Sequence, residues 1–204
     1  MDKLPEIKFI YSESYCRVLY QATATETEKV SLTFEAVINY TIKFGKKLEN
    51  LFLEHKKEIL NIIQRISGFA WNEYADPYIF IYPVYPLRQL QSFSHPLTIK
   101  VREDSVLALG ILIHELAHNN MNVPFSDSRL QEQIMSTIAL IVLEELSLDP
   151  KNTRAFFEAV FQERFDKKFF PLKELKTKTV RNLVVLTDKD NNVCLIRKNG
   201  SDIL

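Results

Sequence analysis

The chain has 204 residues, of which 46% are hydrophobic and 11% aromatic, enough to fill the core of one domain with additions. Its 26 basic residues balance 26 acidic ones, and a net charge of zero excludes a global field that would attract nucleic acid or an acidic membrane. The longest apolar runs, 106–113 and 138–143, are far shorter than the ~20 residues that span a bilayer. We therefore expect neither nucleic acid nor a membrane as a partner.

The first eight residues are rich in charge and lack the apolar segment of a secretory signal peptide. The two cysteines, Cys16 and Cys194, lie far apart and neither belongs to a CxxC pair. This usage is typical of reduced thiols rather than of a disulfide framework. Both observations predict a cytoplasmic protein.

The N-terminal quarter is predicted to form strands. Residues 7–24 contain strand-forming stretches around Phe9 to Tyr11 and Tyr15 to Tyr20, which indicate a hairpin or meander. Every even position from Val30 to Phe44 is apolar, and this period of two predicts a long strand. A helix is the competing interpretation, because a 3.6-residue repeat also runs through the segment. Its members are Val30, Phe34, Val37, Ile38 and Ile42.

After Gly45 the hydrophobic period lengthens to that of a helix, which is predicted to end near Gly68. The opposite face of this helix carries lysines and glutamates and is expected to face solvent. Two strands should follow, at 78–83 and 97–101, flanking a loop with Pro83, Pro86 and Pro96.

A helix should then begin near Asp104 or Ser105, either of which could cap it. A second helix is predicted over 128–147, and an amphipathic helix rich in phenylalanine over 152–170. The tail, 179–197, is typical of a hairpin that turns at a run of Asp, Lys and Asn residues.

The pentapeptide His114-Glu115-Leu116-Ala117-His118 is the most specific motif in the chain. Residues four apart lie on one face of a helix, so the two imidazoles can bind the same tetrahedral zinc ion. The intervening glutamate, Glu115, is then placed beside the metal-activated water, as a general base in hydrolysis requires. Only four histidines occur in the chain, so a His-rich composition does not explain the spacing.

A catalytic zinc needs a third protein ligand. The metzincin pattern would require glycine at position 121 and histidine at position 124, but the chain has Met121 and Pro124. No histidine follows His118, and the later cysteine, Cys194, lies far away in the tail. Carboxylates are therefore the remaining candidates.

The motif helix followed by a glutamate-led helix, Glu132 to Leu143, resembles the gluzincin metallopeptidases, such as the compact ImmA/IrrE-type peptidases. The resemblance covers roughly residues 46–147 and implies that Glu132 is the third ligand. Acidic residues elsewhere are the alternatives, namely Glu144, Glu145 and, more weakly, Asp127.

The resemblance implies a zincin-like core over 46–147. The hydrophobic patterns outside it add N-terminal strands over 1–45 and a C-terminal helix and hairpin over 150–204, and we expect all of these to form a single α+β domain. The resemblance further implies a zinc-dependent metallopeptidase with a peptide or protein substrate and with Glu115 as general base. The strand 97–101 is expected at the edge beside the cleft, where it could pair with an extended substrate. Candidate oxyanion donors are Arg129, His95 and Tyr85. The alternative is a non-enzymatic, metal-stabilised peptidase fold that binds protein.

Overall fold

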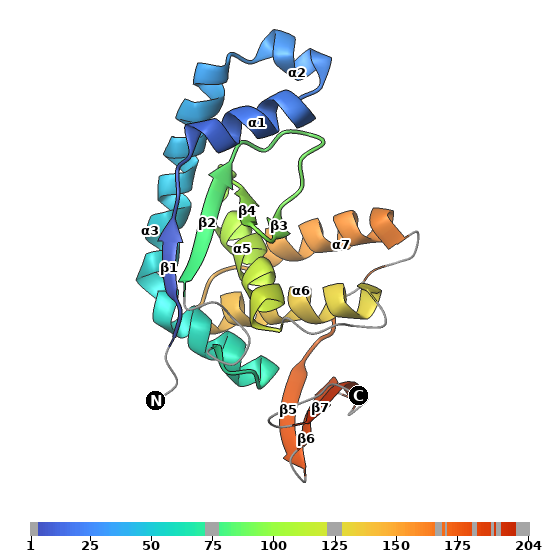
Figure 1. Ribbon diagram of the computed structural model, residues 1–204. Coiled ribbons are helices and arrows are strands. Elements are labelled where there is room, and N and C mark those ends of the chain that lie inside the picture. The colour runs from blue at the N-terminus through green and yellow to red at the C-terminus, as the bar shows by residue number, and fades with distance from the viewer. Residues whose placement is uncertain are drawn as a thin grey trace.

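The structure is a computed structural model that describes residues 4–71, 78–121, 128–165, 169, 171–180, 183–188, 190 and 193–198. It is an α+β fold in which helices surround a small, mainly parallel sheet (Figure 1). The helices are α1 (Glu13–Thr23), α2 (Glu26–Ser31), α3 (Phe34–Ser67), α5 (Ser105–Asn120), α6 (Ser128–Glu145) and α7 (Lys151–Phe165). The strands are β1 (Glu6–Phe9), β2 (Tyr78–Val84), β3 (Phe93–Ser94), β4 (Leu97–Lys100), β5 (Leu175–Val180), β6 (Leu183–Asp188) and β7 (Val193–Lys198).

The main sheet has the order β1-β2-β4-β3, and only β3 runs antiparallel to its neighbour. Alternate residues of β1 and of the first part of β2, including Ile7, Ile79 and Ile81, are buried in the core that the sheet shares with α3 and α5, whereas the first three residues of β4 are all buried. The alternation follows from the period of two in a strand, which places successive side chains on opposite faces. The sheet therefore fixes one side of the motif helix α5.

A strand is present within 97–101, but the prediction that it lies at the edge of the sheet is wrong. β3 pairs with the start of β4, with Phe93 opposite Thr98 and Ser94 opposite Leu97. The edge is therefore occupied over these residues, because the chain folds back on itself just before β4. A substrate could not add to β4 there without displacing β3.

The N-terminal strands predicted over 30–44 and 15–20 are also wrong, because both segments are helical. Thr33 is the N-cap of helix α3, and its side chain accepts a hydrogen bond from the backbone N–H of Ala36. The buried positions of α3 recur every three or four residues, as in a helix, whereas Ala36 and Ile42 of the predicted strand are exposed. The buried set includes Val37, Thr41, Phe44, Leu48 and Phe52. The competing helical interpretation is thus the correct one.

Polar caps explain how α1 and α2 form in place of the predicted meander. The Ser12 side chain accepts the N–H of Tyr15 at the start of α1, and Thr25 forms a capping box with Glu28 at the start of α2. Of the predicted N-terminal strands, only β1 is present in the described residues. It pairs in parallel with β2, far along the chain.

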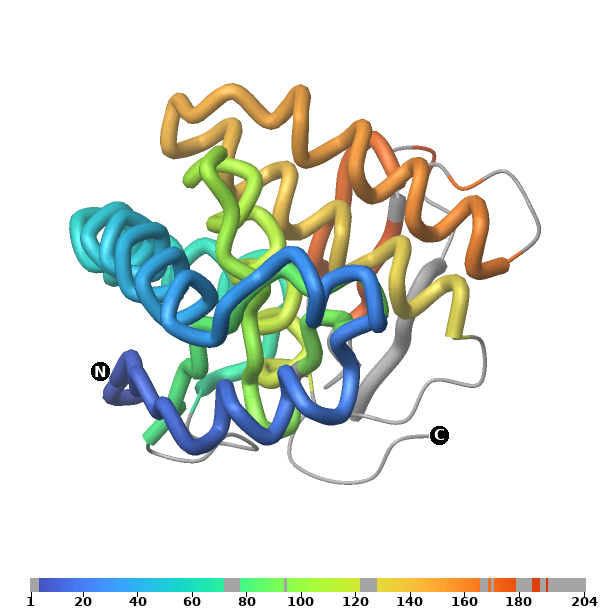
Figure 2. The backbone as a smooth tube through the Cα atoms, turned by 90° about the horizontal axis from the view of Figure 1, so that it is seen from above, coloured from blue at the N-terminus to red at the C-terminus, as the bar shows by residue number. Residues whose placement is uncertain are grey.

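The second half of the described chain agrees more closely with expectation. Asp104 caps α5, and α6 covers most of the predicted 128–147. Helix α7 is described from Lys151 to Phe165, and most of the remaining predicted residues up to 170 lie outside the described residues. Strands β6 and β7 form the predicted hairpin, with β5 as an additional strand. Seen from above, α6 and α7 run alongside each other next to α5 (Figure 2).

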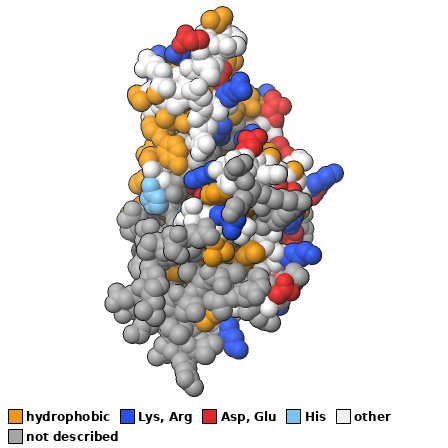
Figure 3. Space-filling model, turned by 90° about the vertical axis from the view of Figure 1, so that its right-hand side faces the viewer, with side chains coloured by type: hydrophobic (Ala, Val, Ile, Leu, Met, Phe, Trp, Pro, Cys, Tyr) orange, Lys and Arg blue, Asp and Glu red, His pale blue; other side chains and the backbone are white. Residues whose placement is uncertain are grey.

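The surface agrees with the balanced composition. On the face shown in Figure 3, basic and acidic side chains of the described residues are interspersed. Among the helices in the described part of the chain, none combines the length and apolar character needed to cross a membrane.

Candidate metal centre

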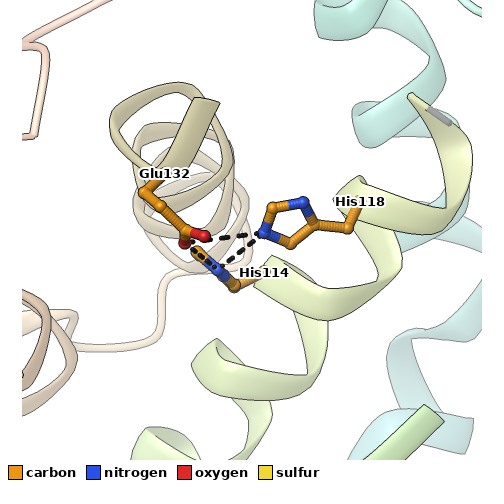
Figure 4. Close-up of side chains that lie close together, drawn as sticks. All are labelled: His114, His118 and Glu132. Carbon is orange, nitrogen blue, oxygen red and sulfur yellow. Dashed lines mark hydrogen bonds and ion pairs between the residues drawn. The ribbon is translucent and has the colours of Figure 1, made fainter. Parts of the chain in front are cut away.

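Three side chains from two helices converge in the interior between α5 and α6. His114 and His118 lie one turn apart on the same face of α5, and Glu132 reaches them from the beginning of α6 (Figure 4). Their ligand atoms all lie within 4.8 Å of one another, and among the described residues they form a group that could hold a metal ion. The sequence motif and the glutamate predicted from the resemblance are thus brought together.

The spacing of the three atoms can be compared with that of ligands around a tetrahedral cation. His114 Nε2 lies 3.1 Å from His118 Nε2 and 3.1 Å from Glu132 Oε2, and His118 Nε2 lies 3.6 Å from the same oxygen. Two ligands that are each ~2.0–2.1 Å from a tetrahedral zinc lie about 3.3–3.4 Å apart. The observed separations bracket that value, so these residues fit a zinc-sized ion.

The protonation states also suit a cation. Burial lowers the pKa of His114 from 6.5 to about 4, so the imidazole is neutral at physiological pH and has a lone pair to offer. Burial alone would raise the pKa of Glu132, but the hydrogen bonds with His114 and His118 hold it well below its usual range. The set therefore combines two imidazoles with an ionised carboxylate, a donor set that zinc commonly takes.

The second ring nitrogen of each histidine, Nδ1, has a polar neighbour on α6. Ser136 Oγ, one turn after Glu132, lies 3.2 Å from His114 Nδ1, and Gln131 Nε2 lies 3.4 Å from His118 Nδ1. In the tautomer that binds a metal, Ser136 can accept the proton on Nδ1, and the lone pair of Nε2 then faces the cluster in place of the proton that bonds Glu132. Helix α6 therefore supplies both a candidate ligand and the group that orients another.

Helix α7 closes the centre from a third side. The rings of Phe157 and Phe161 lie 5.1 and 5.6 Å from the ring of His114, measured between centroids. An Arg164 guanidinium nitrogen lies 3.5 Å from Glu132 Oε1. The phenylalanines exclude water from one side of His114, which is why its side chain is only 4% exposed.

Glu115 is buried beside the cluster on α5. Burial raises its pKa from 4.5 to about 7, and the charges of His118, Glu132 and Arg164 also act on it. A carboxyl group with a pKa near neutrality can exchange a proton under physiological conditions. Glu115 thus lies next to His114, His118 and Glu132, which are called the triad below. This position agrees with the role of general base, which remains a prediction.

The alternative carboxylates lie at the far end of α6, about 18 Å along the helix axis from Glu132. There, Glu144 pairs with Arg154 at 3.6 Å, and Glu145 pairs with Arg65 at 2.6 Å. Both glutamates are exposed on the surface of the protein. The remaining alternative, Asp127, lies outside the described residues.

The three candidate oxyanion donors lie in different places. Tyr85 packs against Tyr40, with ring centroids 4.9 Å apart, in a second cluster of buried side chains next to α1. His95 is exposed and precedes a cis proline, and Arg129 lies in the first turn of α6. Tyr85 is thus not placed at the triad, and a role for the other two stays a prediction.

The contribution of α7 to the candidate centre is not predicted from the sequence. The signal was present as spacing: Phe157, Phe161 and Arg164 are separated by four and three residues and so share one helix face. Ser136 could have been noticed as a hydroxyl one turn beyond Glu132 in an apolar segment. Neither pattern by itself indicates which element the face would contact.

Comparison with known proteins leaves the site to be judged on its geometry. No protein-family model matches the chain, and no curated protein or solved structure is significantly similar to it.

Proposed function

We propose that this chain is a zinc-dependent metallopeptidase whose metal is held by His114, His118 and Glu132. The observation that carries the proposal is the convergence of three ligand atoms within 4.8 Å, with the glutamate of the motif buried next to them. A site that served stability alone would need the ligands but not a carboxylate beside them. Glu115 therefore favours hydrolysis over a structural role.

A zinc ion at this position would act as a Lewis acid and make a water molecule more acidic. The residues of the chain then have separate roles. His114, His118 and Glu132 would hold the ion, Ser136 would orient His114, and the phenylalanines of α7 would keep bulk water away from that side.

Glu115 is the proposed general base. Its carboxylate would take a proton from the attacking water and later donate it to the amine that leaves when the peptide bond breaks. In the metal-free protein burial raises the pKa of Glu115 to about 7, and a bound cation would lower it, which favours the ionised form that accepts the proton from water. The peptide substrate is proposed from the resemblance of the motif helix and glutamate helix to gluzincins.

The test is cleavage of a broad peptide library by the zinc-loaded protein. We expect cleavage that a chelator abolishes and added zinc restores. Glu115→Gln should keep the metal and lose activity, because the amide has a similar shape but cannot accept the proton. Glu54→Gln, an exposed change on α3, is the matched control and should remain active. A Glu115→Gln variant as active as the parent would refute the mechanism.

A metal-stabilised binding module is the second candidate function, and the burial of the centre favours it. The side chains of His114 and Glu132 are only 4% and 11% exposed, which is typical of a closed structural site. This interpretation predicts that the zinc-loaded protein cleaves no peptide and that zinc raises its thermal stability.

A further inference from the structure

Helix α7 presents a continuous face to α6 and to the triad. Two arginines on this face reach glutamates of α6 at its opposite ends: Arg154 lies 3.6 Å from Glu144, and Arg164 lies 3.5 Å from Glu132. Between the arginines, the rings of the phenylalanines contact His114. The two ion pairs join the same two helices, but only one of them involves a residue of the triad.

The two oxygens of Glu132 have different neighbours. Oε2 lies 3.1 Å from His114 Nε2 and 3.6 Å from His118 Nε2, whereas Oε1 lies 3.5 Å from the guanidinium of Arg164. A buried carboxylate free to rotate could present either oxygen, or both, to a metal ion. A cationic donor on Oε1 removes that freedom and leaves Oε2 facing the imidazoles.

The arginine can make this contact at small cost. The side chain of Glu132 is 11% exposed, but that of Arg164 is 52% exposed, so the guanidinium keeps much of its hydration. Its planar group is further held against the ring of Phe165, 5.4 Å away.

We infer that Arg164 is a positioning residue of the metal centre, which holds Glu132 through Oε1 so that Oε2 is presented as the third ligand. The inference rests on the proposed metal site. It adds a residue from α7 to a centre whose proposed ligands come from α5 and α6.

Charge and positioning make opposite predictions for metal affinity. A positive guanidinium close to the centre repels a cation, so its removal would tighten zinc binding if charge were its only effect. If the arginine orients Glu132, its removal weakens zinc binding instead, and partners of metal ligands typically contribute about 10- to 100-fold in affinity. The sign of the change therefore separates the two roles.

The experiment measures zinc affinity by competition with a chromophoric chelator of known affinity. Arg164→Met removes the charge and the donors but keeps much of the length, and we expect zinc affinity to fall about 10- to 100-fold. Arg154→Met removes the equivalent ion pair at the other end of the same helices, and its affinity should stay within about twofold of the parent. Arg164→Lys keeps a cationic donor and should recover most of the loss.

Unchanged or tighter binding in Arg164→Met, with the parent binding zinc, would overturn the role of Arg164 and leave the metal centre standing. Failure of the parent and of Arg154→Met to bind zinc would overturn the metal centre itself, and this inference with it. Thermal unfolding of the metal-free variants shows whether each is folded. An equal loss of affinity in Arg154→Met and Arg164→Met would also contradict the inference, because it would reflect general loosening of α7.

Discussion

Replacing Glu115 by glutamine should stabilise the metal-free protein, in a way that depends on pH. The carboxyl group is buried, and its pKa is raised by that burial from 4.5 to about 7. A group whose pKa is higher in the folded than in the unfolded state opposes folding once it is ionised. The free energy of unfolding should therefore decrease as pH rises from about 4.5 to 7, and the full cost should remain above pH 7.

The magnitude follows from the same two values. The cost is about 1.4 kcal/mol for each pH unit between them, so the ionised carboxylate destabilises the metal-free fold by up to about 3 kcal/mol. Glutamine is neutral throughout this range and avoids the cost. The variant should match the parent near pH 4.5 and exceed it at pH 8.

The assay is urea unfolding of chelator-treated protein at pH 5 and pH 8, with Glu54→Gln as the surface control. The free energy of unfolding of Glu115→Gln relative to the parent should increase between the two pH values, whereas that of the control should not. A Glu115→Gln variant that gains nothing at pH 8 would show that the carboxyl group is not held in a desolvated position, and the reasoning about the base would fail.

Three further changes test the surroundings of the site. Gly110→Ala would place a methyl group 2.4 Å from Thr153 Cγ2, so we expect the free energy of unfolding to fall by about 1–3 kcal/mol. Adding Thr153→Ala in the same chain should largely restore the lost stability. If the losses of the two substitutions were additive, the close packing of the two residues would be contradicted. Ser136→Ala should weaken zinc binding about tenfold in the chelator competition, because His114 Nδ1 loses its neighbour at 3.2 Å, and unchanged affinity would reject that role. Burial lowers the pKa of Lys100 from 10.5 to about 8, so the stability of the parent relative to Lys100→Met should rise between pH 8 and 10 in urea titrations; a flat difference would contradict it.

The His-His-Glu cluster of the candidate metal centre could be predicted from the sequence largely because its signals are local. Two histidines four residues apart lie on the same face whenever their segment is helical. The apolar run before them and the capping residue Asp104 predict that helix. Glu132 required one further step, the return of the chain after a short loop. The alternative ligands Glu144 and Glu145 instead form exposed ion pairs at the other end of α6, away from the two histidines.

The N-terminal segment was misread because its apolar residues satisfy two periods at once. Between Val30 and Phe44, both the strand and the helical repeat find hydrophobic side chains, and the polar caps at Thr25 and Thr33 decide in favour of helices. The pairing of β1 with β2 joins segments about 70 residues apart, which no local pattern encodes.

The contribution of α7 was missed for a similar reason. Its helical face was visible in the spacing of Phe157, Phe161 and Arg164, but its contact with the triad depends on how three helices pack. Such packing is set by side chains across several elements and is not read from one of them.

The most direct test of the metal centre is the zinc content of the protein after saturation and dialysis, measured by elemental analysis. The parent should hold about one zinc per chain, and His114→Ala and Glu132→Ala should lose most of it. Glu144→Ala, which changes the same helix outside the triad, should retain the zinc of the parent. Full zinc occupancy in His114→Ala, or a parent that binds none, would contradict the account.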